Sequence, residues 1–148
     1  MNARKQKSQA GTVLVEAAFT LMLLFMFLLG IIEAGRFMNV QEVLTNAARE
    51  GARMSVAPIT QTTCSYYNGC VSPSDIQTTV QTFLSAANIT NATVTPSTWQ
   101  DPACTSGCVT YTRVQVTATY SLITMSMFGS LEVPLKGEAL MRNETSPY

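Results

Sequence analysis

The sequence contains no histidine and few charged residues. Asp, Glu, Lys and Arg together make up 12% of the 148 residues, and nine basic side chains balance nine acidic ones. Without histidine, the chain lacks the commonest general base and the commonest metal ligand. Without an excess of basic residues, it lacks the surface that attracts nucleic acid. We therefore expect no enzymatic activity, no cofactor or metal, and no nucleic-acid partner.

Hydrophobic residues are abundant instead, and they are concentrated near the N-terminus. In the run from Thr12 to Ile32 the only ionisable residue is Glu16, and about 20 helical residues are enough to cross a bilayer core. The polar leader Met1–Gly11 in front of the run has no acidic residue and carries three basic ones, Arg4, Lys5 and Lys7. Such a leader is typical of a cytoplasmic flank. We predict a single-pass membrane protein with one small domain beyond the span.

All four cysteines follow the span, at Cys64, Cys70, Cys104 and Cys108. An even number favours disulfides formed in an oxidising compartment, which puts the C-terminal domain outside the cytoplasm. Each neighbouring pair brackets a turn signal, so pairing of Cys64 with Cys70 and of Cys104 with Cys108 is favoured among three possible connectivities. A zinc site is a weaker alternative, because the spacings are unusual and histidine is absent.

Glu16 needs a compensating charge if it lies in lipid, because an ionised side chain there costs on the order of 2–3 kcal/mol or more. Cleavage between Gly11 and Thr12 would make Thr12 the new N-terminus and Glu16 the fifth residue, about one helical turn from a positively charged amine. The amine of one subunit could then neutralise Glu16 of a staggered neighbour. This pairing would set the register of an assembly.

The residues around Glu16 resemble a known processing site. The segment Gly11-Thr12-Val13-Leu14-Val15-Glu16 behind a basic leader looks like the prepilin peptidase site of type IV pilin-like proteins. Together with Leu28-Leu29-Gly30-Ile31-Ile32-Glu33-Ala34-Gly35-Arg36 and Ala47-Ala48-Arg49-Glu50-Gly51-Ala52-Arg53, it resembles the TadE-like pseudopilins of the tight-adherence (Flp) pilus system. These three blocks cover about the first third of the chain.

The resemblance implies cleavage by a dedicated prepilin peptidase, retention in the bacterial inner membrane and a minor role in building or priming a pilus. Its implied partners are that peptidase, other pilin or pseudopilin subunits, and membrane proteins of pilus assembly. A major pilin is one alternative, although the family's major subunits are much shorter. A secretory signal peptide and an uncleaved signal-anchored binding protein outside the cytoplasm, which never polymerises, are two further alternatives.

Helical periodicity continues beyond the span, with apolar or small residues on one face at Phe37, Val40, Leu44, Ala47, Ala48 and Gly51. We predict one helix from Thr12 to about Ser55, whose part over residues 33–56 is amphipathic and packs on a domain of residues 57–148. Gly30 and Ala34 form a small-xxx-small pair that is suited to helix packing. Ser72-Pro73-Ser74-Asp75 predicts a capped start for a second helix, which extends to about Asn88. Its predicted apolar face contains Ile76, Val80, Phe83, Leu84 and Ala87.

The last third of the chain predicts an antiparallel hairpin. Apolar and polar residues alternate over residues 113–122 and 131–142, and Phe128-Gly129-Ser130 is a candidate turn. Pro134 cannot donate a ladder hydrogen bond, so the final strand is expected at a sheet edge. Ala92–Pro96 is a weaker strand candidate, with Trp99 in the loop that follows. The predicted fold is a pilin-like α+β domain in which a small antiparallel sheet packs on a long helix.

Overall fold

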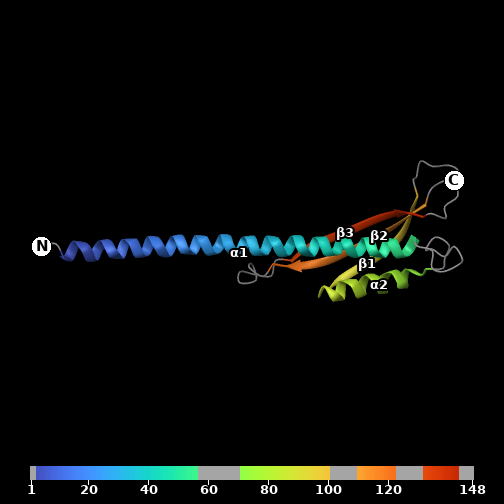
Figure 1. Cartoon of the computed structure of the whole chain (residues 1–148), viewed down its shortest axis with the longest axis horizontal. Coiled ribbons are helices and arrows are strands. Elements are labelled where there is room, and N and C mark those ends of the chain that lie inside the picture. Colours follow the sequence, from blue (N-terminus) through green and yellow to red (C-terminus); the bar gives the residue numbers. More distant parts are fainter. Residues whose placement is uncertain (1–2, 57–70, 101–109, 123–131, 144–148) are drawn as a thin grey trace.

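The computed structural model describes residues 3–56, 71–100, 110–122 and 132–143, with only the backbone of residues 3–10, 99 and 100. Two helices precede three strands (Figure 1): α1 (Ala3–Val56), α2 (Pro73–Ala86), β1 (Ala92–Gln100), β2 (Thr110–Ser121) and β3 (Glu132–Arg142). The N-terminal half of α1 projects away from the rest of the chain, while the other elements gather around its C-terminal half. We call this gathered part the head. The structure confirms the predicted α+β fold class with one long N-terminal apolar helix.

Helix α1 is continuous over 54 residues, so its length is about 80 Å at 1.5 Å per residue. The prediction of an unbroken helix as far as Ser55 is confirmed. The helix begins at Ala3, earlier than the predicted Thr12. The physical reason is that residues 3–10 contain alanine, lysine, arginine and glutamine, which favour helix, and contain neither glycine nor proline.

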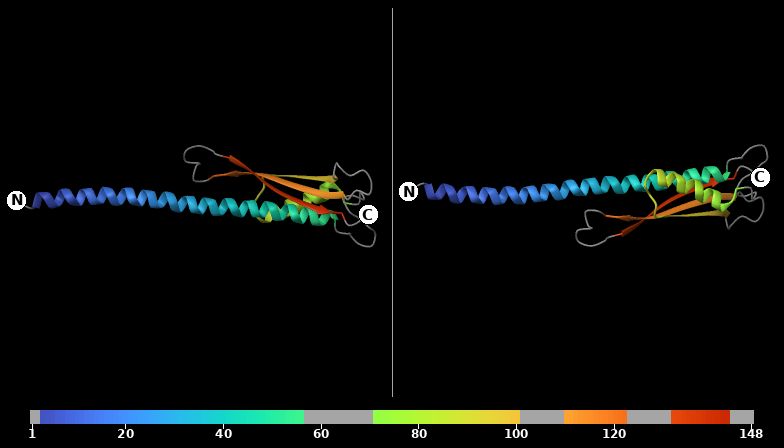
Figure 2. Two further views of the ribbon diagram at one scale, coloured as in Figure 1. Left: turned by 90° about the horizontal axis from the view of Figure 1, so that it is seen from above. Right: turned by 90° about the horizontal axis from the view of Figure 1, so that it is seen from below.

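The three strands form one antiparallel sheet in the order β1-β2-β3, with β2 in the centre. The sheet lies beside the C-terminal half of α1 (Figure 2). Every second residue of β2 from Thr110 to Tyr120 is buried, as expected for a sheet with one covered face. The predicted hairpin alternation is therefore confirmed, and so is the edge position of β3, the strand that contains Pro134.

The core of the head lies between this sheet and the two helices. Leu44, Ala47 and Ala48 of α1 are fully buried, as the helical periodicity predicts, and Ala52 is fully buried as well. Small residues on this face allow the backbones of α1 and β3 to approach each other closely. Gly137 of β3 shows this most clearly, because a Cβ atom there would overlap the main-chain carbonyl group of Leu44 and lie 2.7 Å from the nitrogen of Thr45.

Helix α2 begins with the predicted cap. The Ser72 hydroxyl accepts a hydrogen bond from the Asp75 amide, and the Asp75 carboxylate accepts one from the Ser72 amide. The helix ends in a Schellman motif, in which Asn88 is left-handed (φ 58°) and the Ile89 amide donates to the Leu84 carbonyl at 2.9 Å. The described helix therefore ends at Ala86, slightly before the predicted end at Asn88.

Two sequence predictions were wrong. Phe83 and Ala87 are exposed, because only Ile76, Val80 and Leu84 of α2 face the core. Trp99 belongs to β1, since the pairing of β1 with β2 continues from Ala92 to Gln100, where Gln100 faces Thr110. The predicted loop therefore begins later, and its cysteines, Cys104 and Cys108, lie outside the described residues. So do Cys64, Cys70 and the candidate turn Phe128-Gly129-Ser130.

Candidate membrane-anchoring and assembly site

The apolar half of α1 is exposed all around the helix. Every residue from Gly11 to Ile32 is exposed, including Phe19, Met22, Phe25 and Phe27. In the part of the chain that the structure describes, α1 alone has the length and composition of a membrane-crossing helix. Exposed apolar surface of this extent is costly in water and favourable in lipid, so this half of α1 is a candidate membrane span.

Gly11, Thr12 and Glu16 lie near the end of α1 that is farthest from the head. A Cβ atom added at Gly11 would meet nothing within 4 Å, so this backbone is open to an approaching protein. Thr12 and Glu16 are four residues apart, which puts them on the same side of the helix. The Glu16 carbonyl accepts a hydrogen bond from the Thr20 hydroxyl at 2.9 Å. Among the side chains that the structure describes, no cation pairs with the Glu16 carboxylate.

A buried carboxylate marks the junction between the apolar half of α1 and the head. Glu33, immediately after the apolar run, is only 6% exposed. Its Oε1 atom accepts a hydrogen bond of 2.6 Å from the hydroxyl of Tyr120, which is also buried. Burial raises the pKa of Tyr120, and the hydrogen bond and the charge of Glu33 raise that pKa further.

Phe37 completes this junction, one turn beyond Glu33 on the same face. Its ring packs edge-on against the Tyr120 ring, with centroids 5.9 Å apart and an angle of 84°. The sequence analysis did not identify Glu33 and Tyr120 as interacting residues. A signal was present, because extending the apolar face of Phe37, Val40 and Leu44 one turn backwards leads to Glu33. Nothing in the sequence identifies Tyr120, 87 residues away, as its partner.

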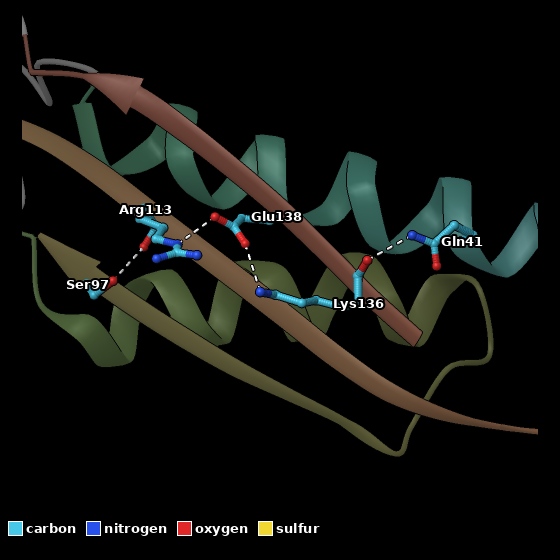
Figure 3. A network of polar contacts seen from close by, with 5 residues as sticks. All are labelled: Gln41, Ser97, Arg113, Lys136 and Glu138. Atoms are coloured by element: carbon cyan, nitrogen blue, oxygen red, sulfur yellow. Dashed lines mark hydrogen bonds and ion pairs between the residues drawn. The ribbon is translucent and has the colours of Figure 1, made fainter. Parts of the chain in front are cut away.

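The uncovered face of the sheet is polar and carries an ion-pair network. Glu138 of β3 pairs with Arg113 of β2 at 2.6 Å and with Lys136 at 2.9 Å (Figure 3). The hydrogen bond from Arg113, followed by that from Lys136, lowers the pKa of Glu138 to about 2. On the helix side, Gln41 of α1 donates a hydrogen bond of 2.8 Å to the Lys136 carbonyl. The network therefore helps to join β2, β3 and α1.

The structure does not describe every residue of the predicted site. Arg4, Lys5 and Lys7 lie in the first turns of α1, but their side chains are outside the described residues, as are all four cysteines. Within the described ranges, no group of three or more His, Cys, Asp or Glu side chains could hold a metal ion.

The fold and the site define a class of protein in which one exposed apolar helix, a candidate membrane span, carries a small α+β head. Residues 11–53 match the model of the family described as TadE-like protein. This match confirms the resemblance inferred from the sequence, and it includes Gly11, Glu16 and Glu33. It lies entirely within α1. Neither the curated proteins nor the solved structures gave a match. The TadE-like match suggests involvement in the tight-adherence pilus system, alongside other pilus components.

Proposed function

We propose that this chain is a minor pilin or pseudopilin, a structural subunit that helps to assemble a tight-adherence pilus for surface attachment or secretion. In this proposal, prepilin peptidase cleaves the bond between Gly11 and Thr12, and the product remains in the inner membrane by its apolar helix. The head lies outside the cytoplasm, where it contacts other pilin subunits and assembly proteins. The subunit acts by binding and positioning other proteins and carries out no chemical reaction.

The position of Glu16 is the observation that supports this proposal best. A carboxylate within an exposed apolar helix is costly in lipid unless a cation balances it. The new amine at Thr12 of a neighbouring subunit would supply that cation. The family match over residues 11–53 supports the same interpretation, because it begins at the proposed cleavage site.

The distribution of exposure along α1 also supports the proposal. Within the described residues, the head packs on α1 only from Glu33 onwards, so about 20 residues before it are available to lipid and to other subunits. Moving such a subunit from the membrane into a fibre would exchange lipid contacts for helix contacts, without unfolding the head. The hollow beside Gly30 and Ala34 would let a second helix approach closely.

Replacing Glu16 tests the assembly role. We expect Glu16→Ala to leave membrane insertion intact, as measured by resistance to alkaline extraction, and to reduce incorporation into pili. Glu42→Ala is the matched control, because Glu42 is exposed on the same helix beyond the span. If the Glu16→Ala subunit enters sheared pili as well as the Glu42→Ala subunit does, Glu16 has no role in assembly.

An uncleaved signal anchor for a binding protein that does not polymerise is the second candidate. The observation in its favour is that α1 runs without a break from Ala3 through Gly11, so that leader and span form one helix. The two candidates predict different N-terminal residues, Thr12 for the processed subunit and Met1 for the anchor.

A further inference from the structure

A polar hollow of about 310 Å³ lies at the end of the head nearest the apolar half of α1. Three segments line it: part of α1, the turn between α2 and β1 (residues 87–91), and the end of β2 (residues 118–121). In both figures the end of β2 reaches farther toward the N-terminus of α1 than this turn does (Figures 1 and 2).

Hydrogen-bond donors gather around this hollow. They belong to lining residues that include Arg36, Asn88, Asn91, Thr119 and Ser121. Arg36 is exposed, and within the described ranges it forms no ion pair and no carboxylate lines the hollow. One unpaired guanidinium with several neutral donors is an arrangement that suits a phosphate or carboxylate group.

The position of Arg36 relative to the bilayer identifies the source of such an anion. If the bilayer core covers Thr12 to Ile32, the span is about 30 Å long and fills the hydrocarbon region. Arg36 then lies four residues, or about 6 Å, beyond the core. The polar headgroup layer on each side of a bilayer is about 5–7 Å thick. The hollow therefore lies beside the layer of phospholipid phosphates.

We propose that this hollow binds the phosphate of an anionic phospholipid headgroup, with Arg36 as the principal contact and the amide of Asn88 as a second donor. The lipid would hold the head at a fixed height above the membrane until the subunit leaves it. The inference rests on the membrane span of the proposed function, and it does not depend on cleavage or on polymerisation.

Glu33 is an acidic residue close to the hollow, because it is hydrogen-bonded to Tyr120, which lines the hollow. Its carboxylate is buried, accepts the hydrogen bond of the Tyr120 hydroxyl and does not line the hollow. Arg36 also lowers the pKa of Tyr120 by its charge, against the larger effects of burial and Glu33, so its guanidinium lies near that ring.

Lipid retention tests this proposal. The full chain would be purified in mild detergent with phosphatidylglycerol and with diacylglycerol of the same acyl chains, and native mass spectrometry would count the lipids retained. We expect phosphatidylglycerol to be retained in preference to diacylglycerol, and Arg36→Gln to reduce its retention about fivefold or more. Asn88→Gly, which keeps the left-handed backbone but removes the amide, should reduce retention to a smaller extent.

Arg49→Gln is the control, because it removes the same charge from an exposed position of α1 outside the hollow. The proposal would be overturned if Arg36→Gln retained as much phosphatidylglycerol as the wild type. It would also be overturned if Arg49→Gln lost as much phosphatidylglycerol as Arg36→Gln. Unchanged retention in Asn88→Gly would show that Arg36 meets lipid without the hollow. Displacement of the lipid by millimolar inorganic phosphate would show a free-phosphate site. Release of the chain by alkaline extraction would instead contradict the membrane span itself.

Discussion

Among the described glycines, Gly137 has the least room for a side chain. In the Gly137→Ala variant the new methyl group would overlap the Leu44 carbonyl group, and main-chain atoms cannot move aside as a flexible side chain can. We expect a loss of about 3 kcal/mol in the free energy of unfolding, at the upper end of the usual range for overpacking. Urea denaturation of the full chain in detergent micelles, followed by the fluorescence of Trp99, would measure it.

Gly35→Ala is the control for this prediction, because a Cβ atom at Gly35 meets nothing within 4 Å. Alanine also favours helix over glycine by up to about 1 kcal/mol, so the control should be as stable as the wild type or more so. Equal denaturation midpoints for the two variants would contradict the close approach of β3 to α1.

The hydrogen bond between Tyr120 and Glu33 leads to a second prediction at the level of single residues. Tyr120→Phe removes a donor to a buried carboxylate while keeping the ring that packs on Phe37. We expect a loss of about 1.5–3 kcal/mol near neutral pH, the usual range for hydrogen bonds to charged groups. Denaturation midpoints of the two proteins at pH 7 would measure this difference, and equal midpoints would count against the bond.

The same pair predicts a dependence on pH, with the sign fixed by the raised pKa of Tyr120. In the folded state this pKa lies above its ordinary value of 10.0, so the folded protein holds the proton more tightly than the unfolded chain does. The stabilisation is fully present below about pH 10 and is lost as the pH rises through the folded pKa. The midpoints of wild type and Tyr120→Phe should therefore converge only in alkaline solution.

At the scale of elements, the ion pairs on the uncovered face of the sheet join β2 to β3. The pKa of Glu138 falls from 4.5 to about 2 in the folded state, mainly through the hydrogen bond from Arg113. Because the folded pKa is lowered, the stabilisation is complete above about pH 4.5 and is lost as the pH falls toward 2. Glu138 is partly exposed, so solvent screening limits its contribution to about 1 kcal/mol.

Glu138→Gln should therefore lower the denaturation midpoint slightly at pH 7 and have little effect near pH 2. The matched control is Glu132→Gln, which removes an exposed carboxylate from the start of the same strand. A difference between wild type and Glu138→Gln that stays constant from pH 7 to pH 2 would be inconsistent with the ion pairs.

The elements that the sequence predicts well are those whose signal is local. The continuity of α1 as far as Ser55, the cap at Ser72 and the alternation along β2 and β3 each follow from neighbouring residues, and the structure confirms them. The edge position of β3 follows from Pro134 alone. By contrast, the sequence gives no measure of how far β1 continues toward Gln100, because that depends on its pairing with β2.

The same distinction applies to the candidate site. Gly11, Thr12 and Glu16 lie in one short stretch, so the family resemblance of that stretch and the spacing between Thr12 and Glu16 are enough to propose their roles. The Glu33–Tyr120 pair and the hollow at Arg36 bring together residues that are far apart in the chain. The pair forms where β2 packs against α1, and the hollow also needs the turn between α2 and β1. Residue spacing does not predict this packing.

At the scale of the whole molecule, α1 divides the protein into an apolar half suited to lipid and a half covered by the head. Glu33 lies at the boundary, where it accepts a hydrogen bond from the Tyr120 hydroxyl. Glu16 lies about five turns before it, where no cation among the described side chains pairs with it. In the proposed function, the cation that balances its charge comes from a neighbouring subunit. The account depends on the origin of that cation, which is the amine that cleavage before Thr12 would create.

The first residue of the protein recovered from bacterial membranes tests this claim most directly. Intact-mass and N-terminal peptide analysis should show a chain that begins at Thr12 in cells with an active prepilin peptidase, and at Met1 in cells without it. A chain that still carries its first eleven residues in the presence of the active peptidase would contradict the account.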